Sequence, residues 1–147
     1  MSEGCSSDLY FHLMEASRAI QDRVRAEASK WKLGITEFFV LETLYIKGSQ
    51  TIQQIAGNVF VSSGSMTYVI DKLEKRGIVY RNPCPNDRRV IHIEFTPEGR
   101  SFMDEIMARH KENLEDIFQV LKPEEAVTLI NMLSKVENHI EVLDIKE

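Results

Sequence analysis

The chain is 147 residues long, and 43% of its residues are hydrophobic while 28% are charged, a balance typical of one soluble globular domain. No apolar run approaches the roughly 18 residues of a membrane span, and the amino terminus is unlike a signal peptide, so we expect a cytoplasmic protein that does not enter a membrane. Two cysteines are too few for a disulfide framework, and the net charge is −5.

The first predicted element is a long helix that begins at an N-cap, Ser6 or Ser7, and continues to about Lys30. Apolar residues recur along it every three or four positions, as expected for one continuous stripe: Leu9, Leu13, Ala16, Ile20, Val24 and Ala28. Leu33 and Gly34 interrupt this pattern, so we expect the helix to end before them.

The second predicted helix begins at Thr36 and ends at Gly48. Ile35 and Val40 stand at the two positions of a hydrophobic staple around this start. The helix is apolar on most sides, through Phe38, Phe39, Val40, Leu41, Leu44, Tyr45 and Ile46. Because a helix of that kind is buried, this segment is the predicted centre of the core.

A short helix is predicted after Thr51, which begins a T-x-x-Q capping box. Gly57 and Asn58 tolerate the backbone turn that ends it. Three apolar residues then fill the corner before the next helix: Val59, Phe60 and Val61. This arrangement predicts the first half of a helix-turn-helix.

The next helix is predicted to begin at an N-cap, Ser62 or Ser63, and to end at Gly77. Its buried stripe consists of Met66, Val69, Ile70 and Leu73. The opposite face carries short hydroxyl side chains first and charges later, as a helix that enters a major groove by its amino end requires. With two residues of the preceding helix, the predicted DNA-binding set is Thr51, Gln53, Ser63, Ser65, Thr67, Tyr68, Lys72 and Lys75. An ordinary amphipathic surface helix would show the same pattern.

A basic two-stranded hairpin, or wing, is predicted next. Its strands are Ile78–Arg81 and Val90–Phe95, and the eight residues between them, NPCPNDRR, are rich in turn formers. Arg88 and Arg89 would lie where the wing passes beside the minor groove. Asp87 would hold the guanidinium of Arg89 by a charge-assisted hydrogen bond. The predicted fold class is therefore mainly α with a small β wing, a winged helix-turn-helix.

Basic side chains gather in this helix-and-wing unit. Residues 64–92 carry six basic and three acidic side chains, whereas residues 98–147 carry six and twelve. Phosphate contacts need a local positive potential, so the acidic total is compatible with DNA binding.

These segments resemble the MarR family of bacterial transcription regulators. The matching residues are SGSMTYVIDKLEKRG at 63–77 and DRRVIHIEFTPEG at 87–99, and the second fits the family's D-x-R wing followed by a strand and T-x-x-G. The similarity extends over nearly the whole chain, in the order of the predicted elements. Within the family, IQQI, SGSMTYVIDKLEK and PCPNDRR are most similar to the subgroup associated with quinone or phenolic stress.

Two long helices are predicted after the wing. The first has Thr96 as N-cap and Pro97 at its first position, and its apolar side carries Phe102, Ile106, His110, Leu114, Ile117 or Phe118, and Leu121. The second restarts at Pro123, and its apolar residues follow a heptad register: Ala126, Leu129, Leu133, Val136, Ile140 and Leu143. Such a register needs a partner helix.

That partner helix could belong to the same chain, but segments 6–33 and 97–145 together offer more apolar surface than the 35–96 lobe can cover. We therefore interpret both segments as dimerisation helices, as the resemblance also implies. The candidate contacts are Leu9, Leu13, Leu129, Leu133, Val136, Ile140 and Leu143. A homodimer would present two recognition helices to half-sites roughly 34 Å apart, so the expected partner is double-stranded DNA with a pseudo-palindromic operator.

The resemblance also implies an effector pocket between the dimerisation helices and the DNA-binding lobe, for a small aromatic or quinone-like molecule. Its candidate lining residues are Tyr10, Phe11, His12, Trp31 and Phe39, although aromatics at such spacings are also ordinary core residues. Tyr10 stands where the peroxide-sensing branch of the family has its reactive cysteine, so peroxide sensing by that route is not expected.

Two thiols are candidates for redox or electrophile sensing. Cys84 lies between two prolines in the wing turn, near arginines that would stabilise a thiolate. Cys5 lies near the amino end of the first helix, which also favours a thiolate. In both cases the alternative is an unreactive small residue.

No nucleophile motif, phosphate loop or carboxylate pair stands out, and the histidines at 12, 92, 110 and 139 show no ligand spacing. We therefore expect no enzyme activity, no metal site and no cofactor. The predicted function is a sequence-specific transcription regulator, a repressor released by a small molecule or electrophile. The alternative is a winged-helix module for protein contact without specific DNA binding, in which the wing arginines meet an acidic partner.

Overall fold

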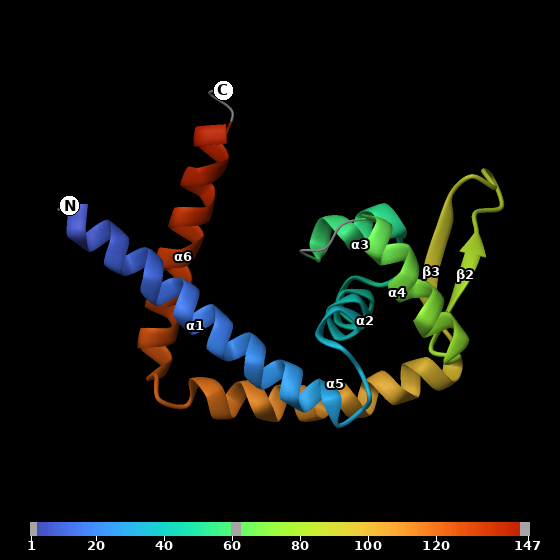
Figure 1. Cartoon of the computed structure of the whole chain (residues 1–147), viewed down its shortest axis with the longest axis horizontal. Helices are drawn as coiled ribbons and strands as arrows, with labels where there is room; N and C mark the ends of the chain where they lie inside the picture. The colour runs from blue at the N-terminus through green and yellow to red at the C-terminus, as the bar shows by residue number, and fades with distance from the viewer. Residues whose placement is uncertain (1–2, 60–62, 145–147) are drawn as a thin grey trace. The chain divides into compact units, whose positions relative to one another are not determined.

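The computed structural model describes residues 3–59 and 63–144, which form helices and one small antiparallel sheet (Figure 1). The elements are α1 (Glu3–Ser29), α2 (Ile35–Lys47), β1 (Gln50–Thr51), α3 (Ile52–Asn58), α4 (Ser63–Lys75), β2 (Val79–Pro83), β3 (Ile91–Phe95), α5 (Pro97–Phe118) and α6 (Pro123–Asp144). This order confirms the predicted fold class. The chain divides into two compact units, 1–111 and 112–147. Among the described helices, none is long and apolar enough to span a membrane.

Helix α2 is central to the core of the first unit, as predicted. Phe38, Leu41 and Leu44 each expose 2% or less of their surface. The core around them draws on α1, α4, β3 and α5, through Val24, Ala28, Met66, Ile70, Leu73, Ile93, Met103 and Ile106. The prediction is wrong for Ile46, which is 66% exposed because it borders an open cavity. In α5 the residue with no exposed surface is Met103, which the predicted stripe did not include.

The described part of helix α1 begins at Glu3, before the predicted N-cap serines, so the predicted start is wrong. Its carboxyl-terminal part is buried in the core through Val24 and Ala28. Nearer its amino terminus the same stripe is exposed, with 48% of Leu9 and 37% of Leu13 accessible. The stripe is therefore continuous, but among the described residues its cover by the core begins only at about Ile20.

Helix α2 begins one residue earlier than the predicted N-cap. Gly34 is the N-cap, and its carbonyl accepts a hydrogen bond from the N–H of Phe38 at 2.9 Å. The predicted start at Thr36, with its hydrophobic staple, is therefore wrong, because the backbone of Gly34 already begins the helical hydrogen bonding.

The helix-turn-helix has the predicted start of α3 and the predicted end of α4, but the predicted turn at Gly57 and Asn58 is wrong, because both residues belong to α3 and Val59 is its C-cap. Both hydrogen bonds of the capping box join Thr51 and Gln54. Helix α4 ends in a Schellman motif, in which Gly77 has a φ of 72° and the N–H of Ile78 donates to the carbonyl of Leu73 at 3.1 Å. A residue with a Cβ would be strained at Gly77, so the residue type at this position determines where α4 stops.

The buried stripe of α4 is also as predicted, and Val59 is buried at the corner between α3 and α4. The remaining predicted corner residues, Phe60 and Val61, and the alternative N-cap Ser62 lie outside the described residues. Helix α4 begins at the other predicted N-cap position, Ser63.

The sheet has three strands in the order β1-β3-β2, all antiparallel. The wing hairpin was predicted as two strands, and β1 was missed because its two residues are too few to show an alternating pattern. Strand β2 also begins at Val79 rather than Ile78 and continues to Pro83, where it pairs with Ile91. Val79 and Ile93 are buried on one face of the sheet, so the strands are anchored to the core.

Helix α5 begins with the predicted cap. The hydroxyl of Thr96 accepts a hydrogen bond from the N–H of Gly99 at 2.9 Å, and the N–H of Thr96 donates to the carbonyl of Ile78 at 3.0 Å. A Cβ at position 99 would lie 1.9 Å from the same carbonyl oxygen. The T-x-x-G sequence therefore allows α5 to begin directly against the end of the turn that follows α4.

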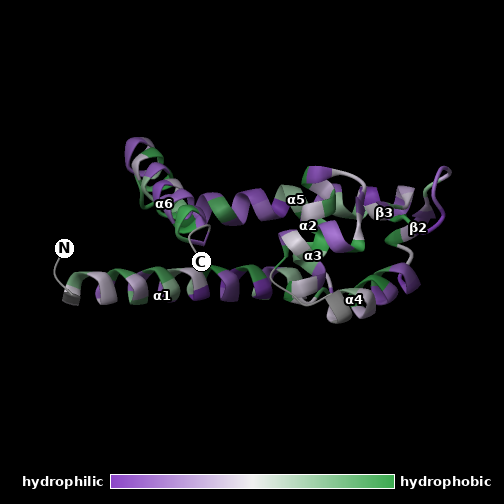
Figure 2. Cartoon of the chain, turned by 90° about the horizontal axis from the view of Figure 1, so that it is seen from above, coloured by the Kyte–Doolittle hydropathy of each residue, from purple (hydrophilic) through white to green (hydrophobic). Residues whose placement is uncertain are grey.

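The second unit contains the end of α5 and the whole of α6. Within the chain α6 has no buried residue, and hydrophobic residues occur along its length (Figure 2). Because most of the stability of a helix in a protein comes from packing of its apolar face, the uncovered stripe of α6 favours a further partner.

Candidate nucleic-acid interface

The amino-terminal half of α4 presents hydrogen-bonding side chains outward. Ser65 and Thr67 are exposed, and Tyr68 has 67% of its surface accessible. Met66 is completely buried on the opposite side, which fixes this orientation. The side chain of Ser63 lies outside what the structure describes. The exposed face therefore combines three hydroxyls with one aromatic ring.

Of the two predicted DNA contacts in α3 and the strand before it, Gln53 is exposed. The hydroxyl of Thr51 accepts a hydrogen bond from the N–H of Gln54 at 3.2 Å, so this oxygen serves as the helix cap. Lys75, at the other end of α4, is exposed, and no carboxylate of a described residue lies within ion-pair distance of it.

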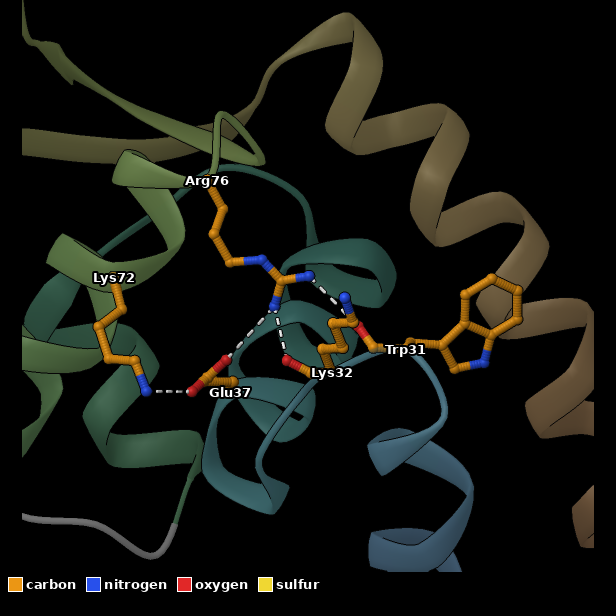
Figure 3. A network of polar contacts seen from close by, with 5 residues as sticks. All are labelled: Trp31, Lys32, Glu37, Lys72 and Arg76. Atoms are coloured by element: carbon orange, nitrogen blue, oxygen red, sulfur yellow. Dashed lines mark hydrogen bonds and ion pairs between the residues drawn. The ribbon is translucent and has the colours of Figure 1, made fainter.

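Lys72 has an internal partner that the sequence did not indicate (Figure 3). Its Nζ lies 2.8 Å from Oε1 of Glu37, a carboxylate on α2 that is only 7% exposed. This hydrogen bond raises the pKa of Lys72. Arg76 approaches the other carboxylate oxygen at 3.8 Å and donates to the backbone carbonyls of Lys32 at 2.8 Å and Trp31 at 3.2 Å. These contacts connect the recognition helix to α2 and to the turn before it.

The wing is joined to α4 by a second pair of contacts that the sequence analysis missed. Arg81 on β2 donates to Asp71 at 2.6 Å and to Glu74 at 2.9 Å. Its side chain is 25% exposed, so these ion pairs are partly shielded from water. The two acidic residues of α4 therefore pair with the wing, and Arg81 offsets part of their negative charge.

At the tip of the wing, Asp87 and Arg89 form the predicted charge-assisted contact. Arg89 donates from Nε to Oδ1 at 3.1 Å and from its second terminal nitrogen to Oδ2 at 3.3 Å, and its backbone N–H donates to Oδ1 at 3.0 Å. These hydrogen bonds from Arg89 lower the pKa of Asp87. The Arg89 side chain is still 91% exposed. Arg88 is exposed as well.

The two cysteines lie in different elements. Cys5 is exposed in the first turn of α1, and Cys84 is half-buried in the wing, where its N–H donates to the carbonyl of Val90 at 2.8 Å. Two of the arginines near Cys84 in sequence, Arg81 and Arg89, are bound to carboxylates as described above. Their charges are therefore partly offset by these carboxylates.

The five candidate pocket residues do not line one cavity in the described chain. Tyr10 and Phe11 are about 60% exposed on α1 and contact each other edge to face, and His12 is exposed. Phe39 borders a cavity of about 300 Å³ beside α1, α2 and α3. Trp31 borders other, separate cavities and contacts the ring of Phe102.

The candidate dimerisation residues are accessible in the single chain. Leu9, Leu129, Val136, Ile140 and Leu143 are between 41% and 50% exposed, Leu13 is 37% exposed, and Leu133 is half-buried. Among the described residues no three His, Cys, Asp or Glu side chains gather as a metal site would require.

Comparisons with known proteins agree on one family. The MarR family model matches residues 33–91. The HTH-type transcriptional regulator MhqR of Bacillus subtilis is 38% identical over 131 residues, which cover 89% of this chain and 90% of that protein. The HTH-type transcriptional repressor MdtR of the same organism is 27% identical over 130 residues, which cover 88% of this chain and 84% of that protein. The crystal structure of a mutant Escherichia coli MarR complexed with operator DNA has a TM-score of 0.78 at 22% identity. The match covers 88% of this chain and 93% of that chain.

Proposed function

Because this chain belongs to the MarR family of transcription regulators, we propose that it is a dimeric repressor that binds a pseudo-palindromic operator. One relative is named a transcriptional repressor, which supports repression rather than activation. Release would follow binding of a small aromatic molecule or reaction with an electrophile such as a quinone.

The observation that carries this proposal is the wing tip. Arg89 is bound to Asp87 in one orientation and yet is 91% exposed. A long side chain in water loses up to about 2 kcal/mol of rotamer entropy when it binds, and a contact that already orders it lowers this cost. A pre-ordered, exposed guanidinium is suited to phosphates or to a narrow minor groove.

The exposed face of α4 supplies the other half of the interface. Ser65, Thr67 and Tyr68 offer hydroxyls and a ring to base edges and phosphates in the major groove. Arg81 holds the wing to this helix through Asp71 and Glu74, so that both can engage DNA as one body.

Dimerisation is supported by the apolar residues of α1 and α6 that remain accessible in one chain. Burying a Leu or Ile side chain contributes about 1.5 to 3 kcal/mol, so a few such residues from each protomer can stabilise a two-fold dimer. Such a dimer would place two α4 helices in successive major grooves on one side of the duplex.

The proposal is tested by selecting bound sequences from a random duplex pool and measuring fluorescence anisotropy on the selected duplex and on a mixed-sequence duplex over a range of salt. We expect binding to the selected duplex to be at least about a thousandfold tighter, with a steep salt dependence. Equal and weak binding to both duplexes would instead indicate a protein-contact module. Sedimentation of the free protein reports the dimer.

A further inference from the structure

Glu37 has an environment in which a carboxylate needs a close cationic partner. Its side chain is 90% buried, and a buried charge without a partner is strongly unfavourable. Arg76 lies 3.8 Å from it, which is beyond hydrogen-bonding distance. Lys72, at 2.8 Å, therefore provides the short contact, and moving its ammonium from Glu37 to a DNA phosphate would leave the carboxylate with the more distant Arg76.

Two further features hold Lys72 against Glu37. Glu37 belongs to the central helix α2, so its position is set by the core, and the Nζ of Lys72 also lies 5.7 Å from the centre of the Tyr68 ring. By contrast, Lys75 and Arg88 have no carboxylate partner among the described residues and remain available to phosphates. One of the cations that the sequence assigns to DNA thus has its charge offset by an internal carboxylate, while its own side chain is 47% exposed.

We infer that Glu37 is a positioning and specificity-determining residue for DNA binding, which withholds Lys72 from the phosphates. The recognition helix then meets the groove chiefly with the hydrogen-bonding groups of its amino-terminal half, which can distinguish bases, whereas a lysine on a phosphate strengthens binding to every sequence alike. This inference rests on the proposed function, because it assigns roles within the same DNA interface.

The salt dependence of binding to a mixed-sequence duplex of about 30 base pairs tests the inference. Glu37→Gln should release Lys72, tighten binding to this duplex at low salt, and steepen the slope of log K against log salt by about 0.9 for each new phosphate contact. Lys72→Met should leave the slope of the parent unchanged. In the Glu37→Gln background, Lys72→Met should restore that slope.

Glu42→Gln is the matched control, because it removes the same charge from the same helix next to His110 rather than next to Lys72. We expect it to leave the slope unchanged, and far-UV circular dichroism confirms that each variant is folded. A flatter slope in Lys72→Met would overturn the inference, because it would show that Lys72 contacts phosphate in the parent. An unchanged slope in Glu37→Gln would overturn it as well, because Lys72 would then not have been withheld.

If Glu37→Gln does not fold, Lys72→Met alone still tests the inference. An unchanged slope of log K against log salt supports it, and a flatter slope refutes it. Failure of the proposed function can be distinguished from failure of the role inferred for Glu37. A parent protein that binds neither the selected nor the mixed duplex overturns both proposals, whereas a flatter Lys72→Met slope with intact operator binding overturns only the role of Glu37.

Discussion

Replacing Gly99 by alanine should weaken the junction between the helix-turn-helix and α5. The added Cβ would lie 1.9 Å from the carbonyl oxygen of Ile78 and 2.7 Å from its carbonyl carbon, whereas real Cβ contacts essentially never fall below 3.0 Å. The start of α5 and Ile78 would therefore have to separate by about 1 Å. This movement would also strain the two hydrogen bonds of Thr96, to Ile78 and from Gly99.

Overpacking of this kind costs about 1 to 3 kcal/mol, and each of the two impaired hydrogen bonds costs about 1 kcal/mol more, so we expect a loss of about 3 to 5 kcal/mol. Urea denaturation at one fixed protein concentration measures it, because a dimer's stability depends on concentration. Gly57→Ala is the matched control, since its Cβ would meet nothing within 4 Å and should stabilise α3 by up to about 1 kcal/mol. A Gly99→Ala midpoint equal to that of the parent would refute the reasoning.

Three other substitutions test the proposed function. Arg89→Ala should weaken operator binding by about 1 to 3 kcal/mol, and more than Arg88→Ala, because only Arg89 is ordered by a carboxylate; equal losses in anisotropy titrations would contradict this. Leu133→Asp should place a charge in the dimer seam, at a cost of several kcal/mol, and abolish operator binding; a folded monomer in sedimentation with unchanged affinity would refute the two-half-site model. The double substitution of Cys84 and Cys5 by serine should prevent release of DNA by a quinone, and release at the parental rate would exclude thiol sensing.

The features that could be predicted from sequence are those whose contacts span a few residues. The capping box of Thr51 and Gln54, the Schellman motif at Gly77 and the contact between Asp87 and Arg89 each depend on side chains and backbone within one turn. Their geometry follows from local steric and hydrogen-bonding preferences, which the residue types already express. The heptad spacing of α6 likewise follows from helical periodicity, although it does not identify the partner that covers it.

Contacts between elements could not be predicted in this way. Glu37 and Lys72 are 35 residues apart, and nothing in the pattern around either residue distinguishes an internal ion pair from a solvated charge. Arg81 is ten residues from Asp71 and would serve equally well as a phosphate contact if β2 did not lie against α4. The packing of helices and strands therefore decides which of these cations pair with the protein's own carboxylates, because a Coulombic contact depends on the distance and burial that only the folded chain establishes.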